Sequence, residues 1–203
     1  MKKVLVTGIS GFVGQHCAAE LLKNGYAVRG SLRSLSKSDE VKNGIKKEVD
    51  TKGNLEFCKL DLMKDEGWDG AMEGCDFVLH VASPFIVKAT KDENDLIKPA
   101  VEGTLRALKA AKKAGVKRVI LTSSTASMQG GQYGVVNLNQ DSWTDVNEKS
   151  VTAYFKSKTL AEKAAWEFIQ NQNGDSKLEL VVINPGPISV SYTHLTLPTK
   201  RIV

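Results

Sequence analysis

A glycine-rich turn near the amino terminus constrains the fold of this chain more than any other feature. Residues 4–14 read VLVTGISGFVG, an apolar, β-branched run that passes through three glycines into a segment with helical spacing. In a strand-turn-helix unit, Gly8 permits a tight turn, Gly11 lets a pyrophosphate approach the backbone, and Gly14 lets the helix lie close to the strand. Amide groups at the start of such a helix favour bound phosphate. The motif therefore predicts a dinucleotide-binding site.

The composition is that of an ordinary globular domain. The chain has 203 residues, of which 41% are hydrophobic and 25% charged, and this length is sufficient for one well-buried domain. Its three cysteines form no C-x-x-C pair, so neither a disulfide framework nor a zinc site is expected. The amino-terminal apolar run is too short for a signal peptide or a membrane span. These features predict a cytoplasmic protein with no membrane segment and no bound metal.

The net charge of +5 does not by itself indicate a nucleic-acid partner. Basic and acidic residues alternate between residues 37 and 48, as is typical of a solvated helix face. A basic cluster surrounds the carboxyl end of another predicted helix, where cations complement the helix dipole. This cluster comprises Lys112, Lys113, Lys117 and Arg118. We therefore expect no binding to nucleic acid.

The carboxyl-terminal segment differs in character from the rest of the chain. Residues 190–199 read VSYTHLTLPT, which resembles the translation of a transposon sequencing adapter. Such segments are excluded from reasoning about the fold, although their Tyr, Thr and Leu residues would also suit a strand. We expect residues 1–188 to form the domain and residues 189–203 to be a non-native tail, the native sequence continuing differently after Ile188.

Short apolar runs and longer helical segments alternate along residues 1–188. The apolar runs predict strands at Lys3–Thr7, Ala27–Leu32, Leu55–Lys59, Phe77–Val81, Arg118–Thr122 and Leu178–Ile183. The longer segments predict helices at Phe12–Asn24, Asp39–Val49, Asp95–Ala114 and Val151–Asn171. This alternation predicts an α/β fold with a doubly wound parallel sheet of the Rossmann type. Ligands of such sheets bind beyond the carboxyl ends of the strands.

The residues after the second predicted strand bear on the choice of cofactor. Sites that prefer NAD usually carry Asp or Glu here to hold the ribose hydroxyls, whereas a 2′-phosphate favours a guanidinium. This chain has Arg33, with Arg29 and Lys37 nearby and no acidic residue before Asp39. NADP is therefore expected in preference to NAD.

Two further strand ends supply candidates for cofactor contacts. Asp61 and Leu62 follow the third predicted strand and are expected near the adenine. The segment Val81–Ser83 comes at the end of the fourth strand and is expected beside the cofactor.

Tyr154 and Lys158 stand four residues apart on a predicted helix, so both side chains project from one face. A lysine ammonium stabilises the phenolate of a neighbouring tyrosine, which makes proton exchange feasible at neutral pH. Ser124 lies just beyond the strand predicted at Arg118–Thr122, at the sheet edge where the cofactor is expected. Its hydroxyl is suited to bind and orient a substrate carbonyl. The three residues predict a site of proton transfer.

Six motifs together resemble the extended short-chain dehydrogenase/reductase family, of the NAD-dependent epimerase/dehydratase type, and particularly its dihydroflavonol reductase-like branch. They are TGxxGxxG from Thr7, HVASP from His80, IKPAVEGT from Ile97, LTSS from Leu121, YFKSKTLAE from Tyr154 and NPG from Asn184. The resemblance covers Lys2 to about Gly186. It implies a triad of Ser124, Tyr154 and Lys158 that reduces an aldehyde or ketone with NADPH. In such a triad the tyrosine gives the proton and the lysine also binds the nicotinamide ribose.

The resemblance also implies which residues contact NADP and what kind of partner reacts. The implied cofactor residues are Thr7, Gly8, Gly11, Phe12, Val13, Gly14, Arg33, Asp61, Leu62, Val81, Ala82, Ser83, Thr122, Tyr154, Lys158 and Pro185. The implied partner is a small carbonyl substrate. Flavonoid-reducing members usually carry Asn or Asp where Gln129 stands here, so flavonoid specificity does not carry over. Members build much of the substrate pocket from a carboxyl-terminal region that this chain lacks after Ile188, which implies truncation before the substrate domain.

Three alternatives remain open from the sequence. A sugar-nucleotide epimerase or dehydratase shares the motifs, but such proteins generally hold NAD and carry an acid where Arg33 stands. A non-catalytic NADP-sensing protein has the same fold, but it typically lacks the pair formed by Tyr154 and Lys158. The chain as printed would be an inactive fragment of an enzyme if the substrate pocket requires sequence beyond Ile188.

Overall fold

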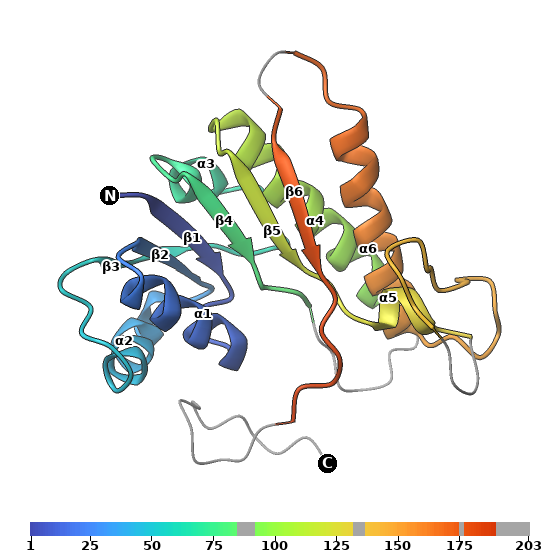
Figure 1. The fold of residues 1–203 in the computed structure, drawn as a ribbon, viewed down its shortest axis with the longest axis horizontal. Coiled ribbons are helices and arrows are strands. Elements are labelled where there is room, and N and C mark those ends of the chain that lie inside the picture. The colour runs from blue at the N-terminus through green and yellow to red at the C-terminus, as the bar shows by residue number, and fades with distance from the viewer. Residues whose placement is uncertain (85–91, 132–136, 175–176, 190–203) are drawn as a thin grey trace.

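Six parallel strands form a single sheet at the centre of the molecule (Figure 1). The computed structural model describes residues 1–84, 92–131, 137–174 and 177–189. The strands are β1 (Lys3–Thr7), β2 (Ala27–Leu32), β3 (Leu55–Lys59), β4 (Phe77–His80), β5 (Arg118–Thr122) and β6 (Glu179–Ile183). Their order is β3-β2-β1-β4-β5-β6, so the winding direction reverses between β1 and β4. The predicted doubly wound Rossmann sheet is confirmed, and ligands of such sheets bind at this reversal point.

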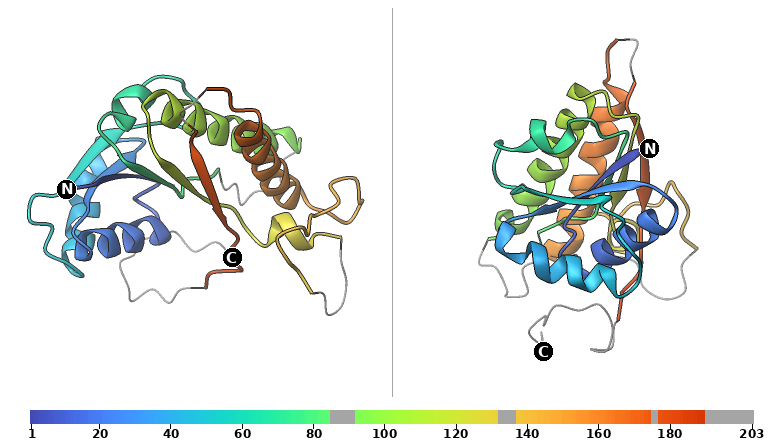
Figure 2. Two further views of the ribbon diagram at one scale, coloured as in Figure 1. Left: turned by 45° about the horizontal axis from the view of Figure 1, so that its top comes forward. Right: turned by 90° about the vertical axis from the view of Figure 1, so that its left-hand side faces the viewer.

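Helices cover both faces of the sheet (Figure 2). One layer contains α1 (Phe12–Lys23) and α2 (Ser38–Lys46), and the other contains α3 (Trp68–Met72), α4 (Asn94–Lys113) and α6 (Ala153–Gln170). A 3₁₀ turn, η1 (Leu35–Lys37), precedes α2, and the short α5 (Ala126–Gln129) follows β5. Among the described residues, no helix is both long and apolar enough to span a membrane.

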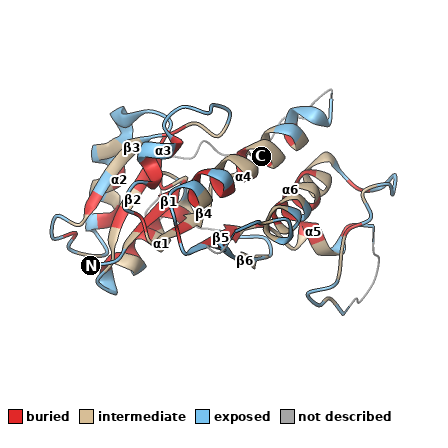
Figure 3. Cartoon of the chain, turned by 90° about the horizontal axis from the view of Figure 1, so that it is seen from above, coloured by how far each residue is buried: buried red, intermediate tan, exposed pale blue. Residues whose placement is uncertain are grey.

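The alternation of side chains along β1 explains why the strand is buried on both faces. Leu5 joins the core beneath α3, α4 and α6, whereas Val4 and Val6 join the core beneath α1 and α2. All three side chains are almost completely buried. At the other extreme, β6 alternates between exposed and half-buried residues, and Ile183 is 52% exposed (Figure 3).

Most predicted element boundaries agree with the structure to within a few residues. Four strands have the predicted bounds, and the other two are one residue shorter. The helix predicted at Asp39–Val49 ends at Lys46, and the one predicted at Val151–Asn171 begins at Ala153 because Thr152 is extended. Three short elements were not predicted: η1, α3 and α5, which span three, five and four residues. Elements this short carry too few residues for a periodic pattern.

Candidate active site

The predicted site residues lie at one edge of the sheet, because the carboxyl ends of parallel strands meet there (Figure 1). Thr7 ends β1 and Thr122 ends β5. Each strand after β1 is followed within three residues by at least one candidate. In strand order these are Arg33 after β2, Asp61 and Leu62 after β3, Val81, Ala82 and Ser83 after β4, Ser124 after β5, and Pro185 after β6.

Two glycines of the turn between β1 and α1 are required by the protein's own packing. Gly8 has a φ of +68°, and a Cβ on it would come within 3.0 Å of the Cα of Ala82. A Cβ on Gly14 would approach the carbonyl oxygen of Gly8 to 2.4 Å. Helix α1 therefore packs directly against the end of β1, as the motif predicts.

Gly11 has a different explanation, because the protein itself leaves room for a side chain there. The nearest atom to a Cβ on Gly11 would be the carbonyl oxygen of Gly8, at 3.4 Å, and the residue is exposed. Gly11 is also the N-cap of α1; no side chain among the described residues caps the helix there, and the first turn carries no acidic residue. The amide groups of Phe12, Val13 and Gly14 begin the helix next to the exposed Gly11. This arrangement fits the pyrophosphate of a dinucleotide.

A buried hydrogen-bonded chain joins the ends of β1 and β4. The hydroxyl oxygen of Thr7 accepts the amide proton of Ala82 at 3.1 Å, and it lies 3.0 Å from Nδ1 of His80. These contacts hold the segment after β4 against the glycine turn. Val81 and Ser83 flank Ala82 on this segment.

The environment of His80 keeps its imidazole neutral. The ring is 2% exposed, and burial lowers its pKa to about 4, with the positive charge of Lys158 contributing in the same direction. His80 therefore carries no charge at neutral pH. Its aromatic neighbour is Trp68 of α3, with ring centroids 6.3 Å apart.

Tyr154 and Lys158 lie together in the first turns of α6. The Nζ atom of Lys158 is 5.9 Å from the centre of the Tyr154 ring. Lys158 is 9% exposed, and burial lowers its pKa to about 8, while the carboxylate of Glu162 acts in the opposite direction. The ammonium therefore remains mostly protonated at neutral pH, close to the tyrosine.

Ser124 lies in a tightly bonded turn between β5 and α5. Its Oγ accepts the amide proton of Ala126 at 3.1 Å, which leaves the hydroxyl proton able to be donated elsewhere. Its carbonyl oxygen accepts bonds from the amide and hydroxyl of Ser127 and from Nδ2 of Asn184, at 2.9, 2.8 and 3.2 Å. Hydrogen bonds from α5 and from the segment after β6 thus hold the backbone of Ser124.

The residues next to Ser124 provide a second test of whether the site fits a cofactor. The Oγ atom of Ser123 is buried and has no hydrogen-bond partner in the described part of the chain. A buried hydroxyl usually has a partner, so this atom is suited to a ligand that enters the site. The carbonyl oxygen of Pro185 accepts the amide proton of Thr125 at 3.0 Å, which holds the segment after β6 against the same turn.

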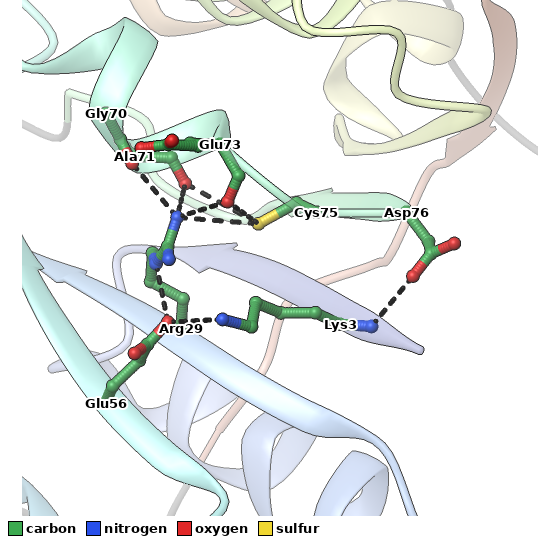
Figure 4. A network of polar contacts seen from close by, with 8 residues as sticks. All are labelled: Lys3, Arg29, Glu56, Gly70, Ala71, Glu73, Cys75 and Asp76. Atoms are coloured by element: carbon green, nitrogen blue, oxygen red, sulfur yellow. Dashed lines mark hydrogen bonds and ion pairs between the residues drawn. The ribbon is translucent and has the colours of Figure 1, made fainter. Parts of the chain in front are cut away.

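Arg29, within β2, and Arg33, directly after it, have different surroundings. Arg33 directly follows β2, is exposed, and forms no ion pair with any residue that the structure describes. Arg29 instead stands within β2, and its side chain contacts Glu56 of β3 and the end of α3 (Figure 4). Its Nε atom donates to Glu56 at 2.8 Å, and its Nη1 atom donates to carbonyl oxygens at the end of α3. The Nε and Nη1 groups of Arg29 are therefore bonded to Glu56 and to the end of α3, whereas Arg33 is exposed.

Asp61 and Leu62, which follow β3, already form hydrogen bonds with other residues of the chain. Asp61 accepts the amide proton of Met63 with one carboxylate oxygen, at 3.0 Å. The carbonyl oxygen of Leu62 accepts a bond from Nη1 of Arg106 at 3.1 Å, and the Leu62 side chain packs against Gly103 of α4. In the described part of the chain, no group of three or more His, Cys, Asp or Glu residues is arranged to hold a metal ion.

Four residues form hydrogen bonds that link the elements of the site, and this role was not predicted. They are His80, Ser127, Glu162 and Asn184. Ser127 and Asn184 both donate to Glu162 of α6, and His80 bonds to Thr7. One signal was available for Glu162, which stands one helical turn after Lys158 and so shares its inward face. The partners of Glu162 lie 35 and 22 residues away in sequence and left no local pattern.

The sequence model of the NAD dependent epimerase/dehydratase family matches residues 4–188. The chain belongs to this family, which confirms the resemblance that its motifs predict. Among curated relatives, anthocyanidin reductase ((2S)-flavan-3-ol-forming) of Vitis vinifera is 36% identical over 207 residues, covering 98% of this chain and 60% of that protein. Dihydroflavonol 4-reductase of Hordeum vulgare is 37% identical over 205 residues, covering 98% of this chain and 56% of that protein.

Solved structures of reductases share the fold. The structure of yeast methylglyoxal/isovaleraldehyde reductase complexed with NADPH has a TM-score of 0.79 at 34% identity, covering 91% of this chain and 57% of that one. Vestitone reductase from alfalfa has a TM-score of 0.71 at 30% identity, covering 91% of this chain and 56% of that one. The chain thus spans 56% to 60% of the length of these four relatives.

Proposed function

We propose that this protein is an NADPH-dependent reductase of an aldehyde or ketone, in which Tyr154 gives the proton. The observation that carries the proposal is the buried ammonium of Lys158 beside the Tyr154 ring, 5.9 Å from its centre, at the carboxyl edge of a Rossmann sheet. Its relatives named as reductases, one of them solved with NADPH, support the reaction class.

In the proposed mechanism, Ser124 and Tyr154 act on the substrate carbonyl oxygen. The hydroxyl of Ser124 donates a hydrogen bond that orients the carbonyl and stabilises negative charge on its oxygen. Tyr154 then donates its phenolic proton to that oxygen, which becomes the alcohol. The nearby ammonium of Lys158 stabilises the phenolate that remains. NADPH, when bound, supplies the hydride that reduces the carbonyl carbon.

The geometry of the sheet edge supports an assignment of the residues that would hold NADPH. The open helix start after Gly11 would receive the pyrophosphate, and the exposed guanidinium of Arg33 would pair with the 2′-phosphate. Lys158 would bind the nicotinamide ribose. The further contacts are assigned to Thr7, Gly8, Phe12, Val13, Gly14, Asp61, Leu62, Val81, Ala82, Ser83, Thr122, Tyr154 and Pro185.

We assign the cofactor-binding domain to residues 1–188 and exclude residues 189–203 from it. Of the latter, residues 190–203 lie outside the described residues. The assignment is tested by comparing NADPH affinity between residues 1–188 and the 203-residue chain. Equal affinities are expected, and weaker binding by residues 1–188 would show that the last segment contributes to the site.

The proposed reaction is tested by following NADPH consumption with a panel of small aldehydes and ketones. The panel is run with the 203-residue chain and with the protein continued by its own downstream coding sequence. We expect NADPH-dependent reduction of at least one carbonyl class by the longer protein, at a higher rate than with NADH. Conversion of a sugar nucleotide with bound NAD, and no carbonyl reduction, would instead identify an epimerase or dehydratase.

A further inference from the structure

Helix α6 carries a buried carboxylate that the proposed chemistry does not use. Glu162 is 6% exposed and stands one turn after Lys158, on the helix that also carries Tyr154. A buried carboxylate is costly unless hydrogen bonds compensate for its lost hydration. Its surroundings therefore indicate what the residue does.

In the described part of the chain, both hydrogen-bond donors to Glu162 come from the segments that surround Ser124. Ser127 of α5 donates through its Oγ atom at 2.7 Å, and Asn184, which follows β6, donates through Nδ2 at 2.8 Å. Both bonds end on the same carboxylate oxygen, Oε2. Hydrogen bonds to a charged acceptor are the stronger kind, so this oxygen holds both donors firmly.

The same two donors also hold the backbone of Ser124. Ser127 Oγ and Asn184 Nδ2 lie 2.8 and 3.2 Å from the carbonyl oxygen of Ser124, and the Ser127 amide lies 2.9 Å from it. Two donor groups therefore sit between Glu162 of α6 and the carbonyl of Ser124. The Asn184 amide nitrogen also lies 2.9 Å from Ser127 Oγ, so its two hydrogens are distributed among three acceptors and tie Asn184 to Ser127 as well. Ser127 has one hydroxyl hydrogen, which the two acceptors share, while its amide secures the Ser124 carbonyl.

Thr144 supports this arrangement from a third segment. Its Oγ1 donates to the carbonyl oxygen of Ala126 at 2.7 Å, and its amide donates to the carbonyl oxygen of Ser127 at 2.8 Å. The four-residue helix α5 is thereby fixed at its other side as well. A helix of one turn has little stability of its own, so these contacts determine its position.

We propose that Glu162 is a positioning residue, which through Ser127 and Asn184 sets the place of Ser124 relative to Tyr154 and Lys158. This inference rests on the proposed carbonyl reduction. The carboxylate and the proton donor belong to one rigid helix, so fixing Ser124 to Glu162 fixes it to Tyr154. Small misplacements of catalytic groups cost large factors in rate, which explains why a buried charge is maintained here.

The test compares Glu162→Gln, Glu162→Leu and Ser127→Ala in the full protein, with Glu167→Gln on the exposed face of α6 as the matched control. Gln keeps an acceptor oxygen of the same reach, whereas Leu removes it. We expect Glu162→Leu to lower kcat for carbonyl reduction by about 10- to 100-fold while the Kd for NADPH changes by less than about 3-fold. Glu162→Gln should restore most of kcat, and Glu167→Gln should match the unmodified protein.

Hydrogen exchange at the amides of Ser127 and Thr144 gives a readout that does not depend on turnover. Their exchange should be faster in Glu162→Leu than in the unmodified protein, and it should be unchanged in Glu162→Gln. If Glu162→Leu does not fold, Ser127→Ala takes its place and should show the faster exchange. Unchanged kcat or unchanged exchange in Glu162→Leu would overturn the positioning role. So would a kcat of Glu162→Gln as low as that of Glu162→Leu. Absence of NADPH-dependent reduction by the unmodified protein would instead overturn the proposed function, and the positioning role with it.

Discussion

The Oγ1 atom of Thr7 lies 3.0 Å from the Nδ1 atom of His80 and joins the carboxyl ends of β1 and β4. This oxygen also accepts the amide proton of Ala82, and its bond to Nδ1 runs in the direction that the tautomer of the neutral ring sets. The two strands on either side of the winding reversal are thus joined through a buried, neutral histidine.

We predict that His80 makes the protein sensitive to acid. Burial lowers its pKa from 6.5 to about 4, so between these values the unfolded chain takes up a proton that the folded chain does not. The free energy of unfolding therefore falls as the pH falls from 6.5 towards 4. Replacing His80→Asn keeps an acceptor for Thr7 but removes the titration.

The measurement is denaturant unfolding of the cofactor-free protein at about pH 7 and about pH 4.5. The difference between the two pH values should be smaller in His80→Asn than in the unmodified protein, by on the order of 1–3 kcal/mol. Thr7→Ser keeps the hydroxyl and should retain the original pH dependence. An equal acid response in His80→Asn would assign the sensitivity to other groups.

We predict that Arg33 determines the preference for NADPH. Arg33→Asp removes the guanidinium expected to pair with the 2′-phosphate and adds a carboxylate suited to ribose hydroxyls. NADPH binding should weaken by about 1.5–3 kcal/mol, and NADH binding should change less or improve. Titration of both reduced cofactors measures the effect. Lys109→Asp on the exposed face of α4 produces the same change in net charge and should leave both affinities unchanged.

We predict that Tyr154→Phe abolishes most turnover without preventing cofactor binding. The substitution removes the phenolic proton but keeps the ring beside Lys158. The kcat for carbonyl reduction should fall by roughly 10²–10⁴-fold, whereas the Kd for NADPH should remain similar. Tyr26→Phe, which removes the phenol of a residue between α1 and β2, is the control. Near-normal turnover by Tyr154→Phe would mean that another group supplies the proton.

The sequence predicted those parts of the fold and site that depend on local pattern. Strand β1 is apolar and β-branched, and it was found at its predicted bounds. Tyr154 and Lys158 stand four residues apart on a helix, so their proximity follows from helical geometry alone. Gly8 and Gly14 show the close contacts that the turn motif implies.

The parts that escaped prediction depend on contacts between distant segments. Helix α5 has four residues, and its position depends on Thr144, which lies 18 residues after Ala126. The contacts of Arg29 were not predicted for a related reason. Its place in the sequence gave no indication of the carbonyl groups at the end of α3, which lie more than 40 residues away.

We predict that Arg29 stabilises the fold through the end of α3. Its Nη1 atom donates to the carbonyl oxygens of Gly70, Ala71 and Glu73 at 2.9, 3.0 and 2.8 Å. Glu56 holds the guanidinium in place through Nε, and the Arg29 side chain is only 15% exposed (Figure 4). A cation at a helix carboxyl end satisfies carbonyl groups that have no partner within the helix. In Arg29→Lys the charge remains, but one ammonium cannot reach both Glu56 and the helix end.

The expected effect is a loss of about 1–3 kcal/mol in the free energy of unfolding, measured with denaturant. Arg118→Lys is the matched control, because Arg118 also lies on a strand and pairs with Glu179, with both side chains about half exposed. Exposed pairs contribute little, so the control should change stability by less than about 0.5 kcal/mol. Hydrogen exchange at the amides of Glu73 and Cys75 should become faster in Arg29→Lys alone. Equal stability of the two variants would show that α3 is held by the packing of Trp68 and Met72 rather than by Arg29.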